Sequence, residues 1–301
     1  MHVTLRQLSA FSSVARNLSF TRAAEEMNLS QPAVSMQIKQ LEQSVGQPLF
    51  EQMGKKIYLT EAGREVYHYS REIMGEISNM EAALASLQGI ENGTLRISVA
   101  TTAHYFAPKL LSIFYQRFPG VDVRLDVTNR ETLLNQLSEN VVDMVIMGQP
   151  PKGMEVEAGA FMENPLVVIA PPDHPFAKER SIPVSKLSGE TFIVREKGSG
   201  TRSAMERFFK HHKLELNTGM EVSSDEAIKQ SVQAGLGLSI MSRDATQMEI
   251  KLGRLCIPDV LHFPIIRHWF VVHRKGKRLS PVAVAFRDFL LNEAAPILKN
   301  K

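Results

Sequence analysis

The sequence predicts a protein that joins a small helical domain to a larger α/β region through one long helix. Two closely spaced helical segments with polar caps occupy residues 19–42. After Thr60, apolar residues recur at steps of three and four as far as Leu87. From Thr94 onwards, short apolar strands alternate with amphipathic helices, which is typical of α/β folds. Together these three patterns indicate a multidomain α and α/β fold class.

The first domain contains two short helices joined by a turn, in the segment SFTRAAEEMNLSQPAVSMQIKQLE. Ser19 can cap the first helix, and Ser30 can cap the second with a proline in its first turn. The second helix has a buried stripe at helical spacing, formed by Val34, Ile38 and Leu41. Its opposite face is small and polar and carries Pro32, Ser35, Met36 and Lys39. This is the layout of a helix-turn-helix whose second helix enters the DNA major groove.

An earlier amphipathic helix, through Leu5, Leu8, Phe11 and Ala15, completes a three-helix core. The segment PLFEQMGKKIYLT then predicts two short strands with a basic tip at Lys55 and Lys56. Such a wing lies on the phosphate backbone, and the alternative is a solvated hairpin tip. We expect Gln31, Pro32 and Ser35 to approach base edges, with Met36 and Lys39 beside them. Thr21, Lys55 and Lys56 are expected to contact phosphates.

A long helix capped by Thr60 follows the predicted wing. Its apolar residues form one narrow stripe, which consists of Ala62, Val66, Tyr69, Ile73, Ile77, Met80, Leu84 and Leu87. So thin a seam predicts pairing with another chain, and the alternative is packing on its own domain. The predicted dimerisation residues are Val66, Ile73, Ile77, Met80 and Leu84. Gly89 and the residues 91–93, ENG, then form a predicted hinge.

The α/β region begins with the strands TLRISVA, VDVRLDV and VDMVIM, separated by helices. Strand–helix alternation predicts a parallel sheet, with helix-starting capping boxes at Thr128 with Glu131 and at Ser223 with Glu226. Near Pro165 a second α/β unit begins, and the strand HWFVVH with a final helix capped by Ser280 returns to the first. The predicted domains are residues 1–60, 61–91 and 92–301. Within the last, lobe I is 92–163 with 267–301, and lobe II is 164–266.

Composition excludes several classes of protein. The 301 residues carry a formal net charge of +3 and a pI near 8.9, which permits nucleic-acid binding without proving it. A single cysteine, Cys256, excludes an internal disulfide framework; it is expected to be a small core residue, the alternative being a redox thiol. The longest apolar run is too short to cross a membrane, so we expect a cytoplasmic protein without a membrane partner.

Motifs for catalysis or metal binding are not found in the sequence. GSGT, residues 198–201, lacks the lysine and the glycine spacing of a P-loop. His211 and His212 are adjacent, so on a helix they point apart and make a poor metal pair. We therefore expect no enzyme activity, no bound metal and no cofactor.

The N-terminal segments and the α/β half together resemble the LysR-type transcriptional regulators over nearly the whole chain. The resemblance rests on FTRAAEEMNLSQPAVSMQIKQLE and LFEQMGKKIYLTEAG. It implies a winged helix-turn-helix, a dimerising linker helix and a two-lobed effector domain like a periplasmic binding protein. It also implies a homotetramer built as a dimer of dimers that binds a double-stranded DNA operator and, indirectly, RNA polymerase.

Segments of the effector half resemble the subgroup that regulates RuBisCO and carbon-dioxide fixation operons. They are YFAPKLL, NRETLL, REKGSGTR, IKQSVQAGLGLS and RLSP. One position departs from the wider family, in which many members have an arginine where this chain has Met36, although this subgroup also tends to have methionine. Met36 can offer only an apolar contact, for example to a thymine methyl group.

Polar loops at expected helix starts predict the effector site, because backbone N–H groups at such ends bind anions. Each threonine there is also a plain helix cap, and the resemblance to a two-lobed effector domain favours the binding role. Arginines beside these loops can hold phosphate bidentately. The candidate effector residues are Thr101, Thr102, Asn129, Arg130, Arg195, Ser199, Gly200, Thr201 and Arg202.

These observations predict a DNA-binding regulator that responds to a small anionic metabolite, a sugar phosphate or a phosphate-bearing nucleotide, and that controls carbon-dioxide fixation genes. One alternative is a LysR-type regulator of another pathway, such as aromatic catabolism or nitrogen or sulfur assimilation. A stand-alone solute-binding protein and an enzyme with an appended DNA-binding domain are alternatives outside the regulator class.

Overall fold

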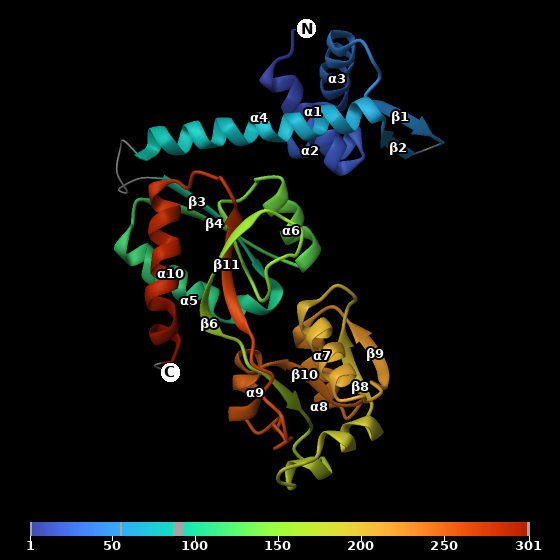
Figure 1. The fold of residues 1–301 in the computed structure, drawn as a ribbon, viewed down its shortest axis with the longest axis vertical. Coiled ribbons are helices and arrows are strands. Elements are labelled where there is room, and N and C mark those ends of the chain that lie inside the picture. Colours follow the sequence, from blue (N-terminus) through green and yellow to red (C-terminus); the bar gives the residue numbers. More distant parts are fainter. Residues whose placement is uncertain (1, 55, 87–92, 300–301) are drawn as a thin grey trace. The chain divides into compact units, whose positions relative to one another are not determined.

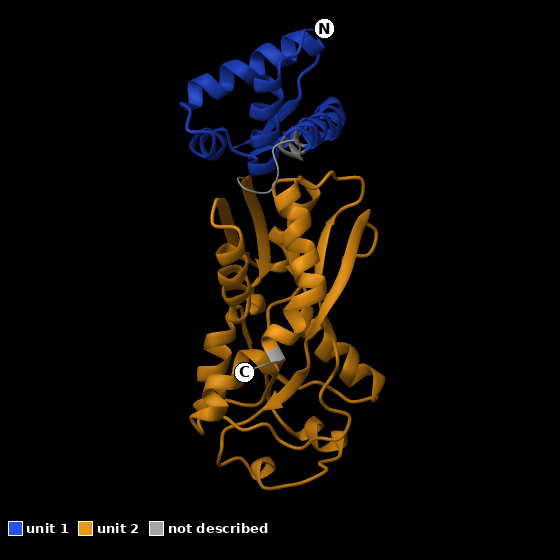
Figure 2. Ribbon diagram, turned by 90° about the vertical axis from the view of Figure 1, so that its left-hand side faces the viewer, with its two compact units in different colours: residues 1–84 blue, residues 85–301 orange. Residues whose placement is uncertain are grey.

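The computed structural model describes residues 2–54, 56–86 and 93–299 (Figure 1). The chain divides into two compact units, residues 1–84 and 85–301, which Figure 2 shows in different colours. Of the predicted features, Lys55, Leu87, Gly89 and the hinge residues 91 and 92 lie outside the described residues. None of the helices that the structure describes is long and apolar enough to cross a membrane.

The first unit is the predicted three-helix domain with a two-stranded wing. It contains α1 (Leu5–Asn17), α2 (Phe20–Glu26), α3 (Gln31–Val45), β1 (Phe50–Met53), β2 (Lys56–Leu59) and α4 (Glu61–Ser86). The predicted caps are confirmed, since the Ser19 hydroxyl accepts from the backbone N–H of Arg22, and that of Ser30 accepts from Ala33. β1 and β2 pair antiparallel, as the wing requires. Short local signals therefore suffice to define this domain.

One apolar core holds the first unit together. Phe11 is fully buried, and its ring lies 5.2 Å from that of Phe50, so the first helix packs directly on the wing. The start of α4 approaches the same core at Gly63. A Cβ added to Gly63 would lie 2.1 Å from the carbonyl oxygen of Leu49, so only glycine fits there. The close approach places the long helix against the base of the wing.

The long helix α4 has a changing environment along its length. The Thr60 hydroxyl accepts from the N–H of Gly63, which confirms the predicted cap. Val66 is partly buried against the core of its own unit, and its predicted place in a seam between chains stays a prediction. Further along, large apolar side chains are exposed on the helix surface, with 42% of Ile73, 56% of Met80 and 56% of Leu84 accessible. The unpaired stripe therefore begins beyond Val66.

The second unit begins with a five-stranded sheet in the order β4-β3-β5-β11-β6. Its strands are β3 (Gly93–Ala100), β4 (Val121–Thr128), β5 (Met144–Met147), β6 (Val156–Glu163) and β11 (His268–Arg274). Helices α5 (Ala107–Arg117) and α10 (Pro281–Lys299) share a buried cluster with one face, and α6 (Arg130–Ser138) shares one with the other. All five strands fall within the residue ranges predicted for lobe I.

The expectation of a purely parallel sheet is wrong. β3 is parallel to β4 and β5, but β11 is antiparallel to both β5 and β6. β6 was not predicted from the sequence, because VEAGAFME mixes small and charged residues and lacks an apolar run. It is held instead by its pairing along the whole of β11. The sheet is therefore mixed, and the strand between β5 and β6 is β11, which comes from the C-terminal part of the chain.

Lobe II is built from two pairs of short strands and three helices. β7 (Leu166–Ile169) pairs antiparallel with β10 (Ser239–Ser242), and β8 (Phe192–Arg195) pairs parallel with β9 (Thr218–Val222). The helices are α7 (Gly200–His211), α8 (Asp225–Gln233) and α9 (Gln247–Lys251). α7 packs on one apolar face and α8 on the other. β7, β8 and β10 are buried along their whole length, and β10 buries two serines in addition to its apolar residues.

The helix starts of the second unit correct two details. Asn129, not Thr128, caps α6, and Ser224, not Ser223, caps α8. Thr128 is still paired in β4, so its backbone is unavailable for a cap. The predicted cap Ser280 is confirmed, because its hydroxyl accepts from the N–H of Ala283.

The exposed stripe of α4 leads to a prediction about assembly. Replacing Ile73 with glutamate should dissociate the oligomer, since a seam between chains would bury the new charge without a partner. Operator affinity should fall with it, because paired half-sites need paired DNA-binding domains. Analytical ultracentrifugation measures the mass. The control His68→Glu adds a carboxylate on another face of the helix and should leave the mass unchanged; an unchanged mass for Ile73→Glu would show that the stripe is not a seam.

Candidate functional site

The outward face of α3 presents the predicted base-reading residues. Gln31, Pro32 and Lys39 are exposed, and 54% of Met36 is accessible. Ser35 is half-buried, and its hydroxyl accepts a hydrogen bond from the Gln31 side-chain amide at 2.9 Å. This bond fixes the direction of the amide, whose remaining donor and acceptor are free for base edges. The helix thus presents one oriented amide beside an apolar thioether.

The predicted phosphate contacts lie on other elements of the first unit. Thr21 is exposed at the start of α2, and Lys56 is exposed at the first position of β2. Lys55 lies outside the described residues. A threonine hydroxyl and a lysine ammonium at these places suit the backbone contacts that fix the register of a protein on DNA.

A second site is a pocket between the two lobes of the second unit. The predicted residues Thr101, Thr102, Arg130, Arg195, Ser199, Gly200 and Thr201 line it together. Asn129 and Arg202 are not among its lining residues. The remaining lining residues, which sequence reasoning missed, are Ala100, Leu133, Met147, Gly148, Gln149, Glu196, Arg267 and Trp269.

Arg267 is the main cation that the sequence did not reveal. One of its guanidinium N–H groups donates to the carbonyl oxygen of Gly200 at 2.7 Å. Burial, followed by repulsion from Arg207 and Arg130, lowers the pKa of Arg267 to about 10. The group is therefore still positively charged at neutral pH. Among the residues that the structure describes, no carboxylate forms an ion pair with it.

Arg130 contributes a second guanidinium from the first turn of α6. It donates to the carbonyl oxygen of Gln149 at 2.7 Å, and burial lowers its pKa. No ion pair involves Arg130 within the described part of the chain. Two cations without counterions therefore line one pocket, an arrangement that an anionic ligand relieves. Gly148 lies against one of these cations, because a Cβ there would lie 3.1 Å from Arg267 Nη2.

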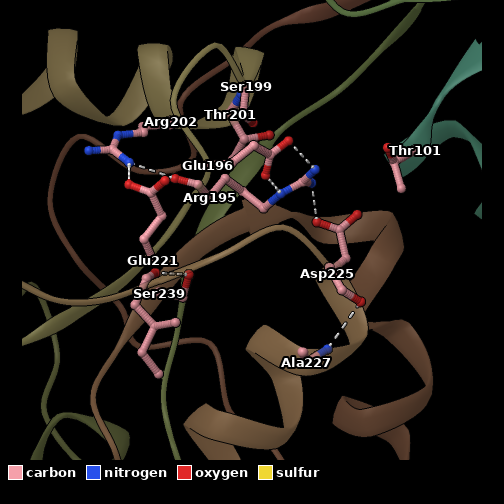
Figure 3. Close-up of polar contacts among 12 residues, drawn as sticks. Thr101, Arg195, Glu196, Ser199, Thr201, Arg202, Glu221, Asp225, Ala227 and Ser239 are labelled. Carbon is pink, nitrogen blue, oxygen red and sulfur yellow. Dashed lines mark hydrogen bonds and ion pairs between the residues drawn. The ribbon is translucent and has the colours of Figure 1, made fainter. Parts of the chain in front are cut away.

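Arg195 lines the pocket, but its positive charge is already paired with carboxylates of the protein. Its guanidinium forms ion pairs with Glu196 at 2.7 Å and with Asp225 at 2.6 Å (Figure 3). Burial acts to lower the pKa of Arg195, but hydrogen bonds and charges of these two carboxylates raise it above its ordinary value. The charge of Arg195 is therefore balanced within lobe II, and its predicted contact with the effector stays a prediction. The side chain ties β8 to the start of α8.

Arg202 does not line the pocket, and it connects elements of lobe II. It pairs with Glu206. It also pairs with Glu221 and donates to the carbonyl oxygen of Arg195 (Figure 3). Its hydrogen bond to Glu221 lowers the pKa of that carboxyl group. Asn129 is similarly engaged, since its side chain caps α6 by accepting from the N–H of Thr132.

Polar loops from both lobes complete the pocket. Thr101 begins the short 3₁₀ helix η1 (Thr101–Tyr105), and its hydroxyl donates to the carbonyl oxygen of Thr128 at 3.2 Å. On the other side, Ser199 caps α7 and accepts from the N–H of Thr201. Gly200 and Thr201 occupy the first turn of this helix, where backbone N–H groups and the helix dipole favour negative charge. Figure 3 shows Ser199 and Thr201 above the Arg195 pair.

Arg267 and Trp269 escaped prediction for one reason. The predicted residues follow strands, because ligands bind beyond the carboxyl ends of parallel strands. β11 is antiparallel to β5, so its beginning lies at the same edge as the carboxyl end of β5. Arg267 directly precedes β11 and thereby reaches the pocket. An arginine before a strand is a signal only when the direction of that strand is known.

Comparison with known families identifies both units. Residues 5–64 match the family described as bacterial regulatory helix-turn-helix protein, lysR family, and residues 88–295 match the LysR substrate binding domain. The chain belongs to the LysR family of transcriptional regulators. The predicted recognition and fold class are confirmed, and the solute-binding alternative without a DNA-binding domain is wrong.

Relatives within the LysR family cover almost the whole chain. A RuBisCO operon transcriptional regulator of Allochromatium vinosum is 57% identical over 98% of both chains. The regulatory domain of Synechocystis CcmR, solved in complex with 2-PG, is 42% identical over 66% of this chain and 96% of that one, with a TM-score of 0.64. A full-length OxyR variant of Pseudomonas aeruginosa shares the fold, with a TM-score of 0.75 at 22% identity over 98% of this chain and 97% of that one.

The DNA face of this LysR-family chain leads to a second prediction. Gln31→Leu removes an oriented amide and should cost about 1–3 kcal/mol on the specific operator while leaving binding to random DNA nearly unchanged. Lys56→Ala should instead weaken binding to every sequence and reduce the salt slope by about one. Fluorescence anisotropy at several salt concentrations separates the two effects. Equal losses on operator and random DNA for Gln31→Leu would contradict the base-reading role.

The buried pair gives a third prediction, on stability. Arg195→Met should leave Asp225, only 3% exposed, as a buried carboxylate with no cation. Breaking such a pair costs about 3–5 kcal/mol of unfolding free energy. Urea unfolding of the effector region measures it. The double variant Arg195→Met with Asp225→Leu should recover most of the loss, and a single variant as stable as the wild type would show that the pair is unimportant.

Proposed function

We propose that this chain regulates carbon-dioxide fixation genes and that a small phosphorylated anion bound between the lobes sets its response. The proposal of an anionic ligand rests on two guanidinium groups, those of Arg130 and Arg267. Both line one pocket, and neither has a carboxylate partner among the described residues. The start of α7 adds N–H donors on the opposite lobe. Together they suit a ligand with at least one doubly charged group.

The relatives support the class of target gene and of ligand. Regulators named for the RuBisCO operon are 57% and 47% identical to this chain over 98% of its length. The effector domain of CcmR is solved with 2-PG, 2-phosphoglycolate, which is a compact phosphorylated acid. A sugar phosphate or a nucleotide satisfies the same two cations. We propose the phosphoryl group as the feature that these ligands share.

We further propose how the ligand acts on the DNA-binding function. Arg130 belongs to lobe I, the start of α7 belongs to lobe II, and Arg267 lies where the chain passes between them. An anion that contacts all three groups has its highest affinity for the conformation in which they converge. Ligand binding therefore shifts the population of lobe conformations towards that one. In a homo-oligomer assembled through α4, this shift changes how paired DNA-binding domains meet the operator and RNA polymerase.

The experiment that tests this function is calorimetry with phosphorylated compounds. 2-Phosphoglycolate, ribulose bisphosphate and a nucleotide should be compared with their unphosphorylated counterparts, and only phosphorylated compounds should bind. Arg130→Gln and Arg267→Gln should each weaken binding by about 10- to 150-fold, the value of a hydrogen bond to a charged group.

Arg202→Gln is the matched control for these variants. It removes a nearby guanidinium that is already paired with Glu206 and Glu221, so ligand affinity should be kept. Operator affinity without ligand should be unchanged in all three proteins. If Arg130→Gln and Arg267→Gln bind phosphorylated compounds as tightly as the wild type, the pocket is not the effector site.

A further inference from the structure

Trp269 has a polar atom that its surroundings leave unused. The residue lines the pocket between the lobes and only 1% of it is exposed. Its indole Nε1–H is buried and has no hydrogen-bond partner among the described residues. Buried indole N–H groups ordinarily find an acceptor, and leaving one unpaired is costly. The orphaned donor therefore requires an explanation beyond packing.

Its position relative to Arg267 supplies one. Arg267 directly precedes β11, Trp269 is the second residue of that strand, and both line the pocket. Arg267 Nε is also buried without a partner in the described part of the chain. Two unused N–H donors, one charged and one neutral, therefore belong to neighbouring residues on the wall of one pocket.

The indole ring is held firmly enough to aim its donor. It belongs to the main apolar core of lobe I, and it meets the ring of Phe106 edge-on at 5.2 Å. A buried ring in such a contact has little freedom to turn its N–H towards another acceptor. The direction of the donor is thus set by the core and not by the ligand.

We propose that the Trp269 N–H donates a hydrogen bond to an oxygen of the anionic effector held by Arg267, and that it determines ligand specificity. This inference rests on the proposed function. A neutral donor adds no attraction for charge as such, but it requires an acceptor oxygen at one point. Ligands that present a C–H there leave the donor unpaired, and a site built around a hydrogen bond rejects such analogues strongly.

The test uses the fact that Trp269 is the only tryptophan in the chain. Growth of a tryptophan auxotroph on the benzothiophene analogue of tryptophan replaces this one residue and substitutes sulfur for the N–H, with the ring shape kept. Calorimetry with 2-phosphoglycolate should show affinity reduced by about ten- to a hundredfold, the value of a hydrogen bond to a charged group. The melting temperature without ligand should not fall.

Phe106→Leu is the matched control, because it removes the edge-on ring contact and keeps the N–H. It should lower the melting temperature and retain ligand affinity within about threefold, since Phe106 does not line the pocket. In the natural protein, 2-phosphoglycolate should also change the emission of the lone tryptophan. This measurement needs no variant, and unchanged emission at saturating ligand would count against the contact.

The two proposals fail in different ways. If the natural protein binds no phosphorylated compound, the proposed function is wrong and the role of Trp269 is wrong with it. If the natural protein binds 2-phosphoglycolate and Arg267→Gln weakens binding, but the benzothiophene protein binds as tightly as the natural one, the anion site stands. In that case the inference about Trp269 alone is overturned.

Discussion

The antiparallel return of the chain through β11 is the constraint on which the effector region depends. β11 pairs with β5 on one side and β6 on the other, so the end of the chain closes the sheet that residues 93–163 begin. Just before it, the two segments that pass between the lobes are bonded to each other, Asn164 N–H to the carbonyl oxygen of Arg267 at 2.7 Å. The lobes are thus joined by a paired connection, and Arg267 lies within it, beside the pocket.

The four arginines predicted or found at the pocket divide into two kinds by their partners. Arg195 and Arg202 are paired with carboxylates, and they connect β8, β9 and the start of α8 within lobe II. Arg130 and Arg267 instead donate their described hydrogen bonds to carbonyl oxygens. A carbonyl oxygen carries no net charge, so the positive charge is not neutralised. An arginine whose charge is free to attract an anion can therefore not be recognised from its position after a strand alone. What distinguishes it here is the lack of a counterion among the described residues, and that is a property of the fold.

Local physical signals explain why the first unit could be predicted closely from the sequence and the pocket only in part. Caps at Ser19, Ser30 and Thr60, and the stripe through Val34, depend on neighbours within one or two helical turns. The direction of β11 and the existence of β6 depend on pairing between residues more than a hundred positions apart. The pocket is hard to predict for the same reason. Its threonines follow strands and were predicted, whereas Arg267 and Trp269 reach it only because β11 runs antiparallel to β5.

The same fold connects the pocket to the contact between the lobes through one short element. The 3₁₀ helix η1 begins at Thr101, which lines the pocket, and ends at Tyr105. Tyr105 packs against the lobe II core that contains α8, and the Lys229 ammonium lies 5.2 Å from the centre of its ring. Lys229 is itself held by Glu226 and Glu249, so the contact is anchored on the far lobe. A displacement of Thr101 would therefore reach Tyr105 as well, because a tight helix of five residues moves nearly as one body.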